Sequence, residues 1–242
     1  MMTKNYTKNH PQTIKDLFDD IADNYETGNA VLSFQTYRLW NRALIHHTYE
    51  ACKPEVLLDL CCGTGDIALP YLKRQQDPCR AHLLDFSSGM LQQAKAKAER
   101  WKLDRHPIHF IEADAQQIPL HSESVDCVTV AYGVRNIQTP QKCYQETLRV
   151  LRPGGTFGIL ELTRPQNPFL KLPHHLYLTT VLPLMGKWVT SNQEAYQYLC
   201  NSIHEFVNPE RVVVDLKEVG FANVRQKPLF GGIATLVLAT KL

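Results

Sequence analysis

The sequence contains no Cys-x-x-Cys pair and no His-Glu-x-x-His segment, although it has seven cysteines and ten histidines. The adjacent Cys61 and Cys62 cannot offer two ligands at the spacing of a zinc finger, and an odd number of scattered cysteines does not suit a disulfide framework. The pairs His46-His47 and His174-His175 are sequence neighbours, so their rings do not share a helical face. The sequence therefore predicts neither a metal centre nor a disulfide set, and its histidines are interpreted as surface or core side chains.

Long basic runs, flexible linkers and low-complexity tracts are also absent. Lysine and arginine total 26 against 24 aspartates and glutamates, which lacks the electrostatic footprint of a nucleic-acid-binding protein. Residues 1–24 are polar and have no apolar core of signal-peptide length, so we expect neither export nor membrane insertion but a cytoplasmic location. With 242 residues, 44% of them hydrophobic, the chain can bury one sizeable core, and we expect one domain with additions.

Five apolar runs typical of buried parallel strands alternate with turn and helix signals. They lie near residues 55–60, 80–85, 107–111, 125–131 and 156–162. This alternation predicts an α/β fold with a doubly wound sheet. Residues 224–226 and 233–239, on either side of Pro228 and Gly231-Gly232, predict a hairpin added at the sheet edge.

Two helices have recognisable starts. Ser87-Ser88 predict the cap of a helix with lysines on one face and, on the other, Met90, Leu91, Ala94, Ala98 and Trp101. Thr139 as the cap and Pro140 in the first turn predict a second helix, which Arg152-Pro153-Gly154-Gly155 ends.

The first predicted strand ends in a glycine turn, and the second ends in a carboxylate. Gly63-Thr64-Gly65 follows the first strand, and Asp85 ends the second. At the carboxyl ends of parallel strands this pair is typical of a nucleotide site, because the glycines let backbone approach the ligand and the acid binds ribose hydroxyls. Asp59, four residues before Gly63, suits the cationic amino and sulfonium groups of S-adenosylmethionine better than a pyrophosphate.

The same residues have plainer interpretations. Gly63 to Ala68 also satisfies the dinucleotide pattern of NAD and FAD enzymes. The two glycines could serve only the turn, and Asp85 could only cap the helix that begins near Ser87.

Two further loops follow predicted strands and therefore lie at the same edge of the sheet. Asp114-Ala115 follows the third strand, where a carboxylate can accept a hydrogen bond from an adenine amino group. Arg135-Asn136 follow the fourth strand and place a cation and an amide there. A loop aspartate and a surface ion-pair partner are the respective alternatives.

Several segments resemble the ubiquinone/menaquinone biosynthesis C-methyltransferases, over roughly residues 15 to 241. The resemblance rests on residues 59–66, on Asp85-Phe86-Ser87 with Met90-Leu91, and on the segments 133–136, 149–155, 160–161, 194–199, 202–203 and 231–233. The amino-terminal signature of the family is matched by Tyr25, Asn29, Leu32-Ser33, Arg38 and Trp40, and departs from it at Glu26, Gly28 and Gln35.

The resemblance implies a class I S-adenosylmethionine-dependent methyltransferase fold. This is a mostly parallel seven-stranded sheet with a carboxyl-terminal antiparallel hairpin and helices on both faces. It implies S-adenosylmethionine as the cofactor and a polyprenylated quinol as the acceptor. The expected cofactor-binding residues are Asp59, Gly63, Thr64, Gly65, Asp85, Phe86, Met90, Asp114, Ala115 and Ala131, the last where some members carry serine. The ending Gly231-Gly232-Ile233 resembles the menaquinone branch more than the ubiquinone branch.

The implied chemistry is attack of a ring carbon on the sulfonium methyl group once a neighbouring hydroxyl is ionised. A phenol with a pKa near 10 needs roughly 4 kcal/mol to ionise at pH 7, and one charge-assisted hydrogen bond supplies about 1.5–3 kcal/mol. We therefore expect Arg135 to stabilise the phenolate, directly or through a water, together with another group. Asn136 and Tyr25 are the candidates to position the ring. The sequence assigns no general base.

The apolar residues 168–188 are too short and too interrupted by proline to span a bilayer. We expect them to cover the acceptor and to contact the membrane surface as a peripheral element; a helix packed on the sheet is the alternative. The expected units are a helical lid (12–50), a cofactor-binding core (51–165), an acceptor-covering insertion (166–210) and a carboxyl-terminal helix with the edge hairpin (211–242).

Two other functions remain compatible with the glycine turn. A nicotinamide-dependent reductase would not explain Asp59, Arg135-Asn136 or the hairpin, and a non-catalytic S-adenosylmethionine-binding subunit would not need Tyr25 and Arg38. A homodimer and a quinone-synthesis complex are both open as assembly states.

Overall fold

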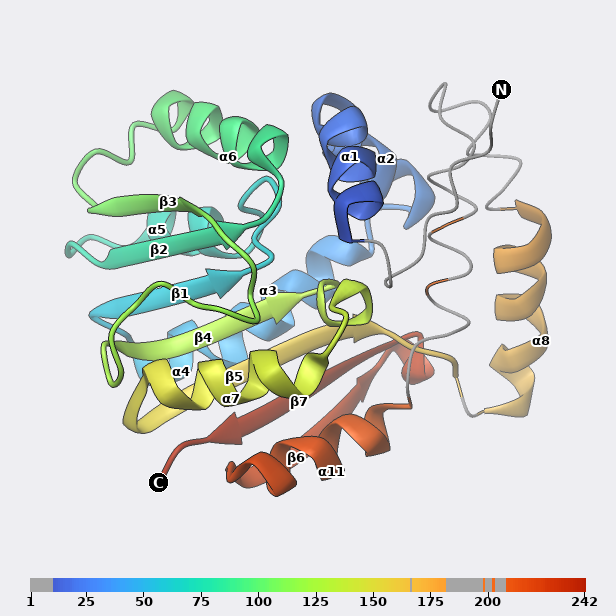
Figure 1. The fold of residues 1–242 in the computed structure, drawn as a ribbon. Helices are drawn as coiled ribbons and strands as arrows, with labels where there is room; N and C mark the ends of the chain where they lie inside the picture. Colours follow the sequence, from blue (N-terminus) through green and yellow to red (C-terminus); the bar gives the residue numbers. More distant parts are fainter. Residues whose placement is uncertain (1–10, 166, 182–197, 199–201, 203–207) are drawn as a thin grey trace.

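The computed structural model describes residues 11–165, 167–181, 198, 202 and 208–242. Its centre is a seven-stranded sheet in the order β3-β2-β1-β4-β5-β7-β6 (Figure 1). The strands are β1 (Val56–Leu60), β2 (Arg80–Asp85), β3 (Ile108–Glu112), β4 (Val125–Ala131), β5 (Leu151–Leu162), β6 (Ala222–Leu229) and β7 (Ala234–Thr240). Strands β1 to β5 are parallel, and β7 pairs antiparallel with both β5 and β6. The predicted strands and hairpin are confirmed.

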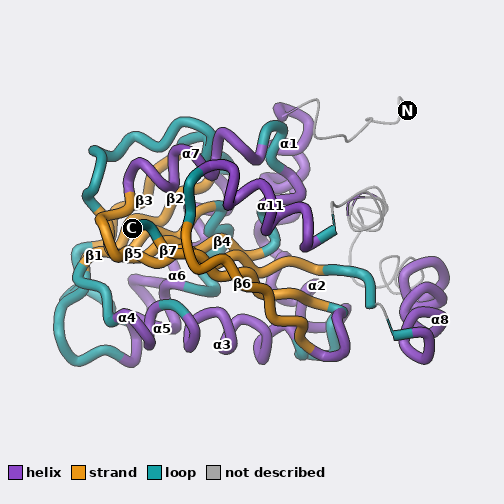
Figure 2. The backbone as a smooth tube through the Cα atoms, turned by 90° about the horizontal axis from the view of Figure 1, so that it is seen from below, coloured by secondary structure: helices purple, strands orange, loops and turns teal. Residues whose placement is uncertain are grey.

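Helices cover both faces of the sheet, as Figure 2 shows. One layer contains α3 (Tyr37–His47), α4 (Tyr49–Cys52), α5 (Ala68–Arg74) and α6 (Ser88–Arg100), and the other contains α7 (Pro140–Val150) and α11 (Pro209–Val219). Every residue of β1 is buried, which explains its continuous apolar sequence. The strand order reverses between β1 and β4, and ligands of open α/β sheets bind at that point.

The amino-terminal helices α1 (Pro11–Ile21) and α2 (Tyr25–Leu32) lie beyond the carboxyl ends of the strands (Figure 1). Three acids bind α6 at successive positions, one from α1, one from the 3-10 turn η1 (Ala22–Asn24) between the two helices, and one from α2. Asp19 accepts hydrogen bonds from the Ser87 hydroxyl at 2.6 Å and the Gly89 N–H at 2.9 Å. Asp23 accepts one from Gln93 at 2.6 Å, and Glu26 pairs with Lys97. This row of contacts holds the two helices over the glycine turn.

The helix starts differ in part from the expectations. Ser87 caps α6 as expected, since its hydroxyl accepts the Met90 N–H at 3.1 Å. Thr139 precedes α7, but its side chain makes no cap hydrogen bond, and the helix start rests on Pro140. Lys97 is buried, which corrects the expected exposed lysine face, because its ammonium group has partners across the interface.

The segment predicted to end α7 also begins a strand. Helix α7 stops at Val150, and β5 starts at Leu151, five residues before the expected strand. Its pairing with β4 shifts between Val125 and Cys127, so Arg152 to Gly155 form an irregular stretch within the ladder.

Two other segments complete the described chain. Helix α8 (Pro168–Leu176) continues into a π-helical turn, η3 (Tyr177–Val181), and lies apart from the sheet in both views (Figures 1 and 2). The predicted alternative of a helix packed on the sheet is therefore wrong for α8. Trp188 and most of the family-like segment 194–203 lie outside the described residues. Among the described residues, no helix is long and apolar enough to cross a membrane.

Candidate active site

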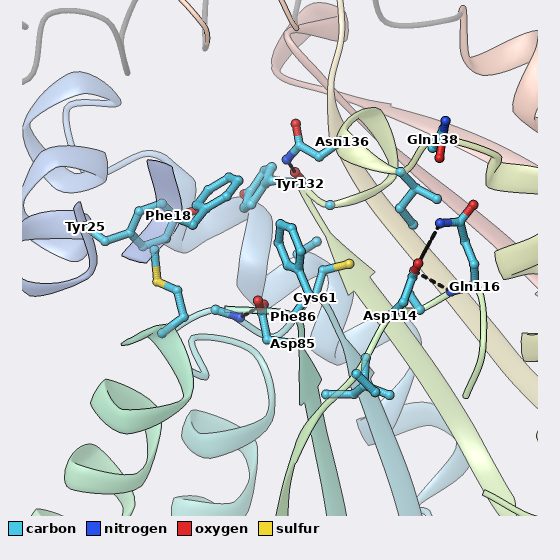
Figure 3. A pocket seen from close by; sticks show the side chains of 18 residues that line it. Phe18, Tyr25, Cys61, Asp85, Phe86, Asp114, Gln116, Tyr132, Asn136 and Gln138 are labelled. Atoms are coloured by element: carbon cyan, nitrogen blue, oxygen red, sulfur yellow. Dashed lines mark hydrogen bonds between the residues drawn. The ribbon is translucent and has the colours of Figure 1, made fainter. Parts of the chain in front are cut away.

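A pocket of about 750 Å³ lies at the carboxyl ends of β1, β2 and β4 (Figure 3). Seven of the ten predicted cofactor-binding residues line it, namely Gly63, Asp85, Phe86, Met90, Asp114, Ala115 and Ala131. Tyr25 and Asn136 also line it. Among the lining residues that the sequence did not single out for this purpose are Phe18, Gln116, Tyr132 and Gln138. We call this space the polar-mouthed pocket.

Asp85 occupies the end of β2 and is almost fully buried. One carboxylate oxygen accepts the Gly63 N–H at 2.8 Å, and the other accepts the Ser87 N–H at 2.9 Å. Burial raises the pKa of Asp85 to about 6, although these backbone hydrogen bonds oppose the shift. Because each oxygen of a carboxylate can accept more than one hydrogen bond, Asp85 can still accept hydrogen bonds from two neighbouring hydroxyl groups of a ligand. Asp85 thus connects the glycine turn to the start of α6 and is more than a helix cap.

Asp114 lies at the far end of the polar-mouthed pocket and is exposed. Its carboxylate accepts the Gln116 N–H at 2.9 Å and the Gln116 side-chain amide at 2.9 and 3.1 Å (Figure 3). The Gln116 carbonyl oxygen in turn accepts the Thr139 N–H at 3.0 Å. The carboxylate is therefore held in place by its own loop and by the start of α7.

A smaller cavity of about 400 Å³ continues under the glycine turn and is lined by Asp59, Thr64 and Asp66. Asp59 accepts hydrogen bonds from the Thr129 hydroxyl at 2.8 Å and the Ala68 N–H at 3.2 Å. Burial raises the pKa of Asp59 to about 7, against the effect of these two donors. Gly65 lines neither this cavity nor the polar-mouthed pocket. Its φ of +79° and its close approach to Leu69 serve the bend into α5.

Lys97 joins the glycine turn to the lid. Its ammonium group contacts Asp66 at 2.6 Å, Glu26 and, at 3.4 Å, the Thr64 hydroxyl. The lysine is 3% exposed, whereas the two carboxylates keep partial access to water. Glu26, a departure from the family signature, is thus linked to the turn through Lys97.

Replacing Lys97 by methionine should lower the free energy of unfolding by about 2 kcal/mol, because two carboxylates lose a buried partner but regain some water. Urea denaturation measures the change. Lys95→Met, on the exposed side of the same helix, is the matched control and should stay within about 0.5 kcal/mol of the unchanged protein. Equal stability of the two variants would contradict the role of Lys97.

A second, larger cavity of about 1320 Å³ adjoins the polar-mouthed pocket. Its walls are mostly apolar and come from α2, α3, α8 and the strand ends, and include Leu32, Phe34, Tyr37, Trp40, Leu162, Leu170, Pro173, Leu178, Phe230 and Ile233. Tyr25 and Tyr132 line both spaces. We call this space the apolar cavity.

Arg135 lines the apolar cavity and is buried against Glu161 at the end of β5. Its Nη1 donates to Glu161 Oε2 at 2.6 Å, and its backbone N–H donates to Oε1 at 3.2 Å. Burial works against the charged form, but the Glu161 carboxylate raises the pKa of Arg135 above its ordinary value. Its buried Nε has no hydrogen-bond partner among the described residues. A buried unpaired donor of a charged group is costly, and an oxygen from a ligand would satisfy it.

Asn136 and Tyr25 lie on either side of Tyr132 in the polar-mouthed pocket (Figure 3). The Asn136 side-chain oxygen accepts a hydrogen bond from the Tyr198 hydroxyl at 2.7 Å. Burial raises the pKa of Tyr25, while a hydrogen bond with Asn29 and the charge of Arg135 oppose the rise. The Tyr25 hydroxyl therefore stays protonated at neutral pH and can act as a donor.

The lid signature only partly faces these spaces. Tyr25, Asn29, Leu32, Ser33 and Trp40 line the apolar cavity, but Arg38 is exposed and lines none of the cavities described above. Gln35, where the family has glycine, has a φ of +64°, in the left-handed region that favours glycine. The backbone at Gln35 therefore adopts the conformation that the glycine of the family signature would favour.

The arrangement is compatible with the methyl donor that the resemblance implies. Asp85 offers acceptors for a ribose, the exposed Asp114 offers an acceptor for an adenine amino group, and Asp59 lies where a cationic methionine end would extend. The shared wall at Tyr25 and Tyr132 would then bring the methyl group next to the apolar cavity.

Comparison with known proteins supports the same family. Residues 4–241 match the model of the ubiE/COQ5 methyltransferase family. A demethylmenaquinone methyltransferase of Protochlamydia amoebophila is 49% identical over 236 residues, with 98% of each chain covered. A ubiquinone/menaquinone biosynthesis C-methyltransferase UbiE of Campylobacter jejuni is 34% identical over 238 residues, which cover 96% of this chain and 98% of the relative.

Solved structures give the fold. A SAM-dependent methyltransferase from Thermotoga maritima aligns with a TM-score of 0.63 at 18% identity, covering 94% of this chain and 99% of that chain. One from Aquifex aeolicus aligns with a TM-score of 0.56 at 17% identity, covering 77% and 82%. The predicted fold class is confirmed by these alignments and by the sheet order. Because the family match extends over nearly the whole sequence, the chain belongs to the ubiE/COQ5 methyltransferase family and is an S-adenosylmethionine-dependent methyltransferase.

Proposed function

We propose that the enzyme methylates a ring carbon of a polyprenylated quinol, converting demethylmenaquinol to menaquinol. The observation that carries the proposal is the junction of a polar-mouthed pocket with a large apolar cavity at Tyr25 and Tyr132. A quinol with an isoprenoid tail needs both a few polar contacts for its ring and an extended apolar wall. Two relatives named demethylmenaquinone methyltransferase, at 49% and 38% identity, support the choice of ring.

The donor side is assigned to ten residues. Asp85 binds the ribose hydroxyls, Asp114 and Ala115 bind the adenine, and Asp59 pairs with the amino group of the methionine end. Phe86, Met90 and Ala131 form the apolar walls, and Gly63, Thr64 and Gly65 shape the turn. When bound, S-adenosylmethionine supplies an electrophilic methyl group on a sulfonium.

The acceptor side is assigned to the apolar cavity. The ring lies between Tyr25, Tyr132 and Arg135, and the tail extends along apolar side chains that include Trp40, Leu162 and Phe230. The unpaired Nε of Arg135 donates to the oxygen that becomes the phenolate. Asn136 supports this loop through its contact with Tyr198.

Two donors together account for the ionisation that one could not. A charge-assisted hydrogen bond from Arg135 contributes about 1.5–3 kcal/mol, and a neutral one from the Tyr25 hydroxyl contributes about 0.5–1.5 kcal/mol. Their sum is about 2–4.5 kcal/mol, and its upper end reaches the roughly 4 kcal/mol that a phenol with a pKa near 10 requires at pH 7. The hydroxyl proton leaves to water, and the ionised oxygen makes the neighbouring ring carbon nucleophilic. That carbon would take the methyl group while the electron pair of the broken C–S bond stays on sulfur, and loss of the ring proton to water would restore the aromatic quinol.

We also propose how the chain is divided and where it acts. Residues 12–50 form the lid, 51–165 the cofactor-binding core, 166–210 the acceptor-covering insertion, and 211–242 the closing helix and hairpin. The enzyme works in the cytoplasm as a peripheral protein at the inner face of a membrane, since its acceptor carries a lipid tail.

Incubation with methyl-labelled S-adenosylmethionine and reduced demethylmenaquinone tests the reaction. We expect the label on the naphthoquinol ring carbon, detected by mass spectrometry of the extracted quinone. A parallel incubation with 2-polyprenyl-6-methoxy-1,4-benzoquinol tests the runner-up, ubiquinone-type methylation, which the UbiE relative supports. Label on the benzoquinol alone would show that the acceptor is the benzoquinol and not demethylmenaquinol. Label on neither compound would refute quinol methylation.

Cofactor binding should release a proton from Asp59 near neutral pH. Its pKa of about 7 in the free protein leaves it about half protonated at pH 7. Pairing with the ammonium group favours the carboxylate and lowers this pKa, so about half a proton leaves at pH 7, and release fades as the pH rises above 8. Calorimetry in two buffers of different ionisation enthalpy measures the release. Asp59→Asn should abolish it, and an unchanged proton count in that variant would contradict the assignment.

A further inference from the structure

Helix α8 is apolar on two sides, yet none of its residues is buried. Leu170, Pro173 and His174 form one row that lines the apolar cavity. Phe169, Leu172 and Leu176 form a second row, exposed by 88%, 64% and 53%. Exposed apolar side chains that gather on one side of a helix mark a contact with another molecule or with a membrane. The second row therefore calls for an apolar environment outside the fold.

The exposed row continues into the rim of the apolar cavity. Phe34 and Phe230 line the cavity while remaining 69% and 51% exposed. Phe34 lies 6.3 Å, between ring centroids, from Tyr177, which follows α8 and donates a hydrogen bond to the Leu32 carbonyl. We call Phe34, Phe169, Leu172, Leu176 and Phe230 the apolar rim. Figures 1 and 2 both show α8 at the outer end of the molecule, away from the sheet.

The charged residues near the apolar rim indicate which kind of surface binds it. Residues 165–181 contain Lys171 as their single lysine or arginine and no aspartate or glutamate. An apolar helix with a cation and no acid suits the interface of a bilayer that contains anionic lipids.

We propose that the apolar rim inserts into the headgroup region of an anionic lipid bilayer and that the quinol enters the apolar cavity there without crossing water. This inference rests on the proposed function, which supplies the lipid-tailed acceptor. Ring-first entry follows from the geometry, because Arg135 lies in the cavity wall with the two junction tyrosines, whereas Phe34 and Phe230 lie at the rim. The tail then stays in contact with the bilayer during the reaction.

Vesicle sedimentation tests the proposal. The whole protein is mixed with vesicles of phosphatidylcholine alone or with one-third phosphatidylglycerol. The triple variant Phe169→Gln, Leu172→Gln, Leu176→Gln removes the outer row with a residue that favours helices. Val214→Gln with Leu242→Gln, which alter exposed apolar residues elsewhere, is the control. Circular dichroism and binding of S-adenosylmethionine verify folding of each variant.

We expect the unchanged protein and the control to bind anionic vesicles about fivefold better than neutral ones, and the triple variant to lose roughly tenfold or more of its binding. Methylation of 1,4-naphthoquinol without a tail should be the same in all three proteins, whereas methylation of tailed quinol in vesicles should fall with binding.

The rim proposal would be overturned if the triple variant bound vesicles as well as the control does. It would also be overturned if the unchanged protein bound no vesicles and formed a dimer that dissociates in the triple variant. Vesicle binding as expected, with no methylation of either quinol, would instead refute the proposed function and leave the membrane contact standing.

Discussion

Arg135→Ala lowers kcat by roughly 100- to 1,000-fold, the range found when one donor to a developing oxyanion is removed, while the Kd for S-adenosylmethionine stays within about twofold. The reason is the position of the side chain. Arg135 lines the apolar cavity but not the polar-mouthed pocket, and its buried Nε has no hydrogen-bond acceptor among the described residues. Stopped-flow or steady-state kinetics with a tail-less quinol give kcat, and calorimetry gives the Kd.

Arg135→Lys is the informative control, because lysine keeps the charge but loses the fork that holds Glu161 and the quinol oxygen together. We expect it to recover only part of kcat. The pH profile should also change, since loss of phenolate stabilisation moves the rise of kcat to higher pH. Equal losses of kcat and cofactor affinity in Arg135→Ala would show that the residue serves folding or donor binding instead.

Asp85→Ala raises the Kd for S-adenosylmethionine by roughly 100-fold or more, because two charge-assisted hydrogen bonds to the ribose contribute about 1.5–3 kcal/mol each. The variant also leaves the N–H groups of Gly63 and Ser87 without their acceptor. Calorimetric titration measures the loss. In the unchanged protein, affinity should begin to fall below about pH 7, where Asp59 takes up its proton, and should fall more steeply below about pH 6, since the raised pKa of Asp85 then converts the ribose acceptor to the protonated form.

Asp114→Ala is the matched control for Asp85→Ala. Its carboxylate is exposed and contacts its own loop, so its hydrogen bond to the adenine competes with water. We expect about a tenfold or smaller loss of affinity. If Asp85→Ala and Asp114→Ala weaken binding equally, Asp85 is a structural cap and the ribose lies elsewhere.

The strands and the donor pocket were accessible from sequence because they rest on local patterns. Buried parallel strands require continuous apolar runs, and the glycine turn and Asp85 end two such strands. The strands bring Gly63, Asp85, Asp114 and Ala131 to one edge whatever the details of the loops. Hence seven predicted residues line one pocket.

The ion pairs between residues far apart in the sequence could not be predicted from the sequence. Glu161 pairs with Arg135 because the end of β5 lies beside the end of β4, where Leu160 pairs with Ala131. An acid within the buried run 156–162 was the available signal, since a buried carboxylate needs a partner. Lys97 was placed on a solvated face because helical periodicity cannot show that Glu26 and Asp66 approach it from other segments.

The proposed reaction requires one geometry. The donor methyl group in the polar-mouthed pocket and the quinol ring in the apolar cavity must face each other between Tyr25 and Tyr132. A crystal structure with S-adenosylhomocysteine and a tail-less naphthoquinol tests it. The account predicts the sulfur in the polar-mouthed pocket, aimed at the apolar cavity, and a ring oxygen about 3 Å from an Arg135 nitrogen. A ring bound outside the apolar cavity, or a sulfur turned away from Arg135, would contradict it.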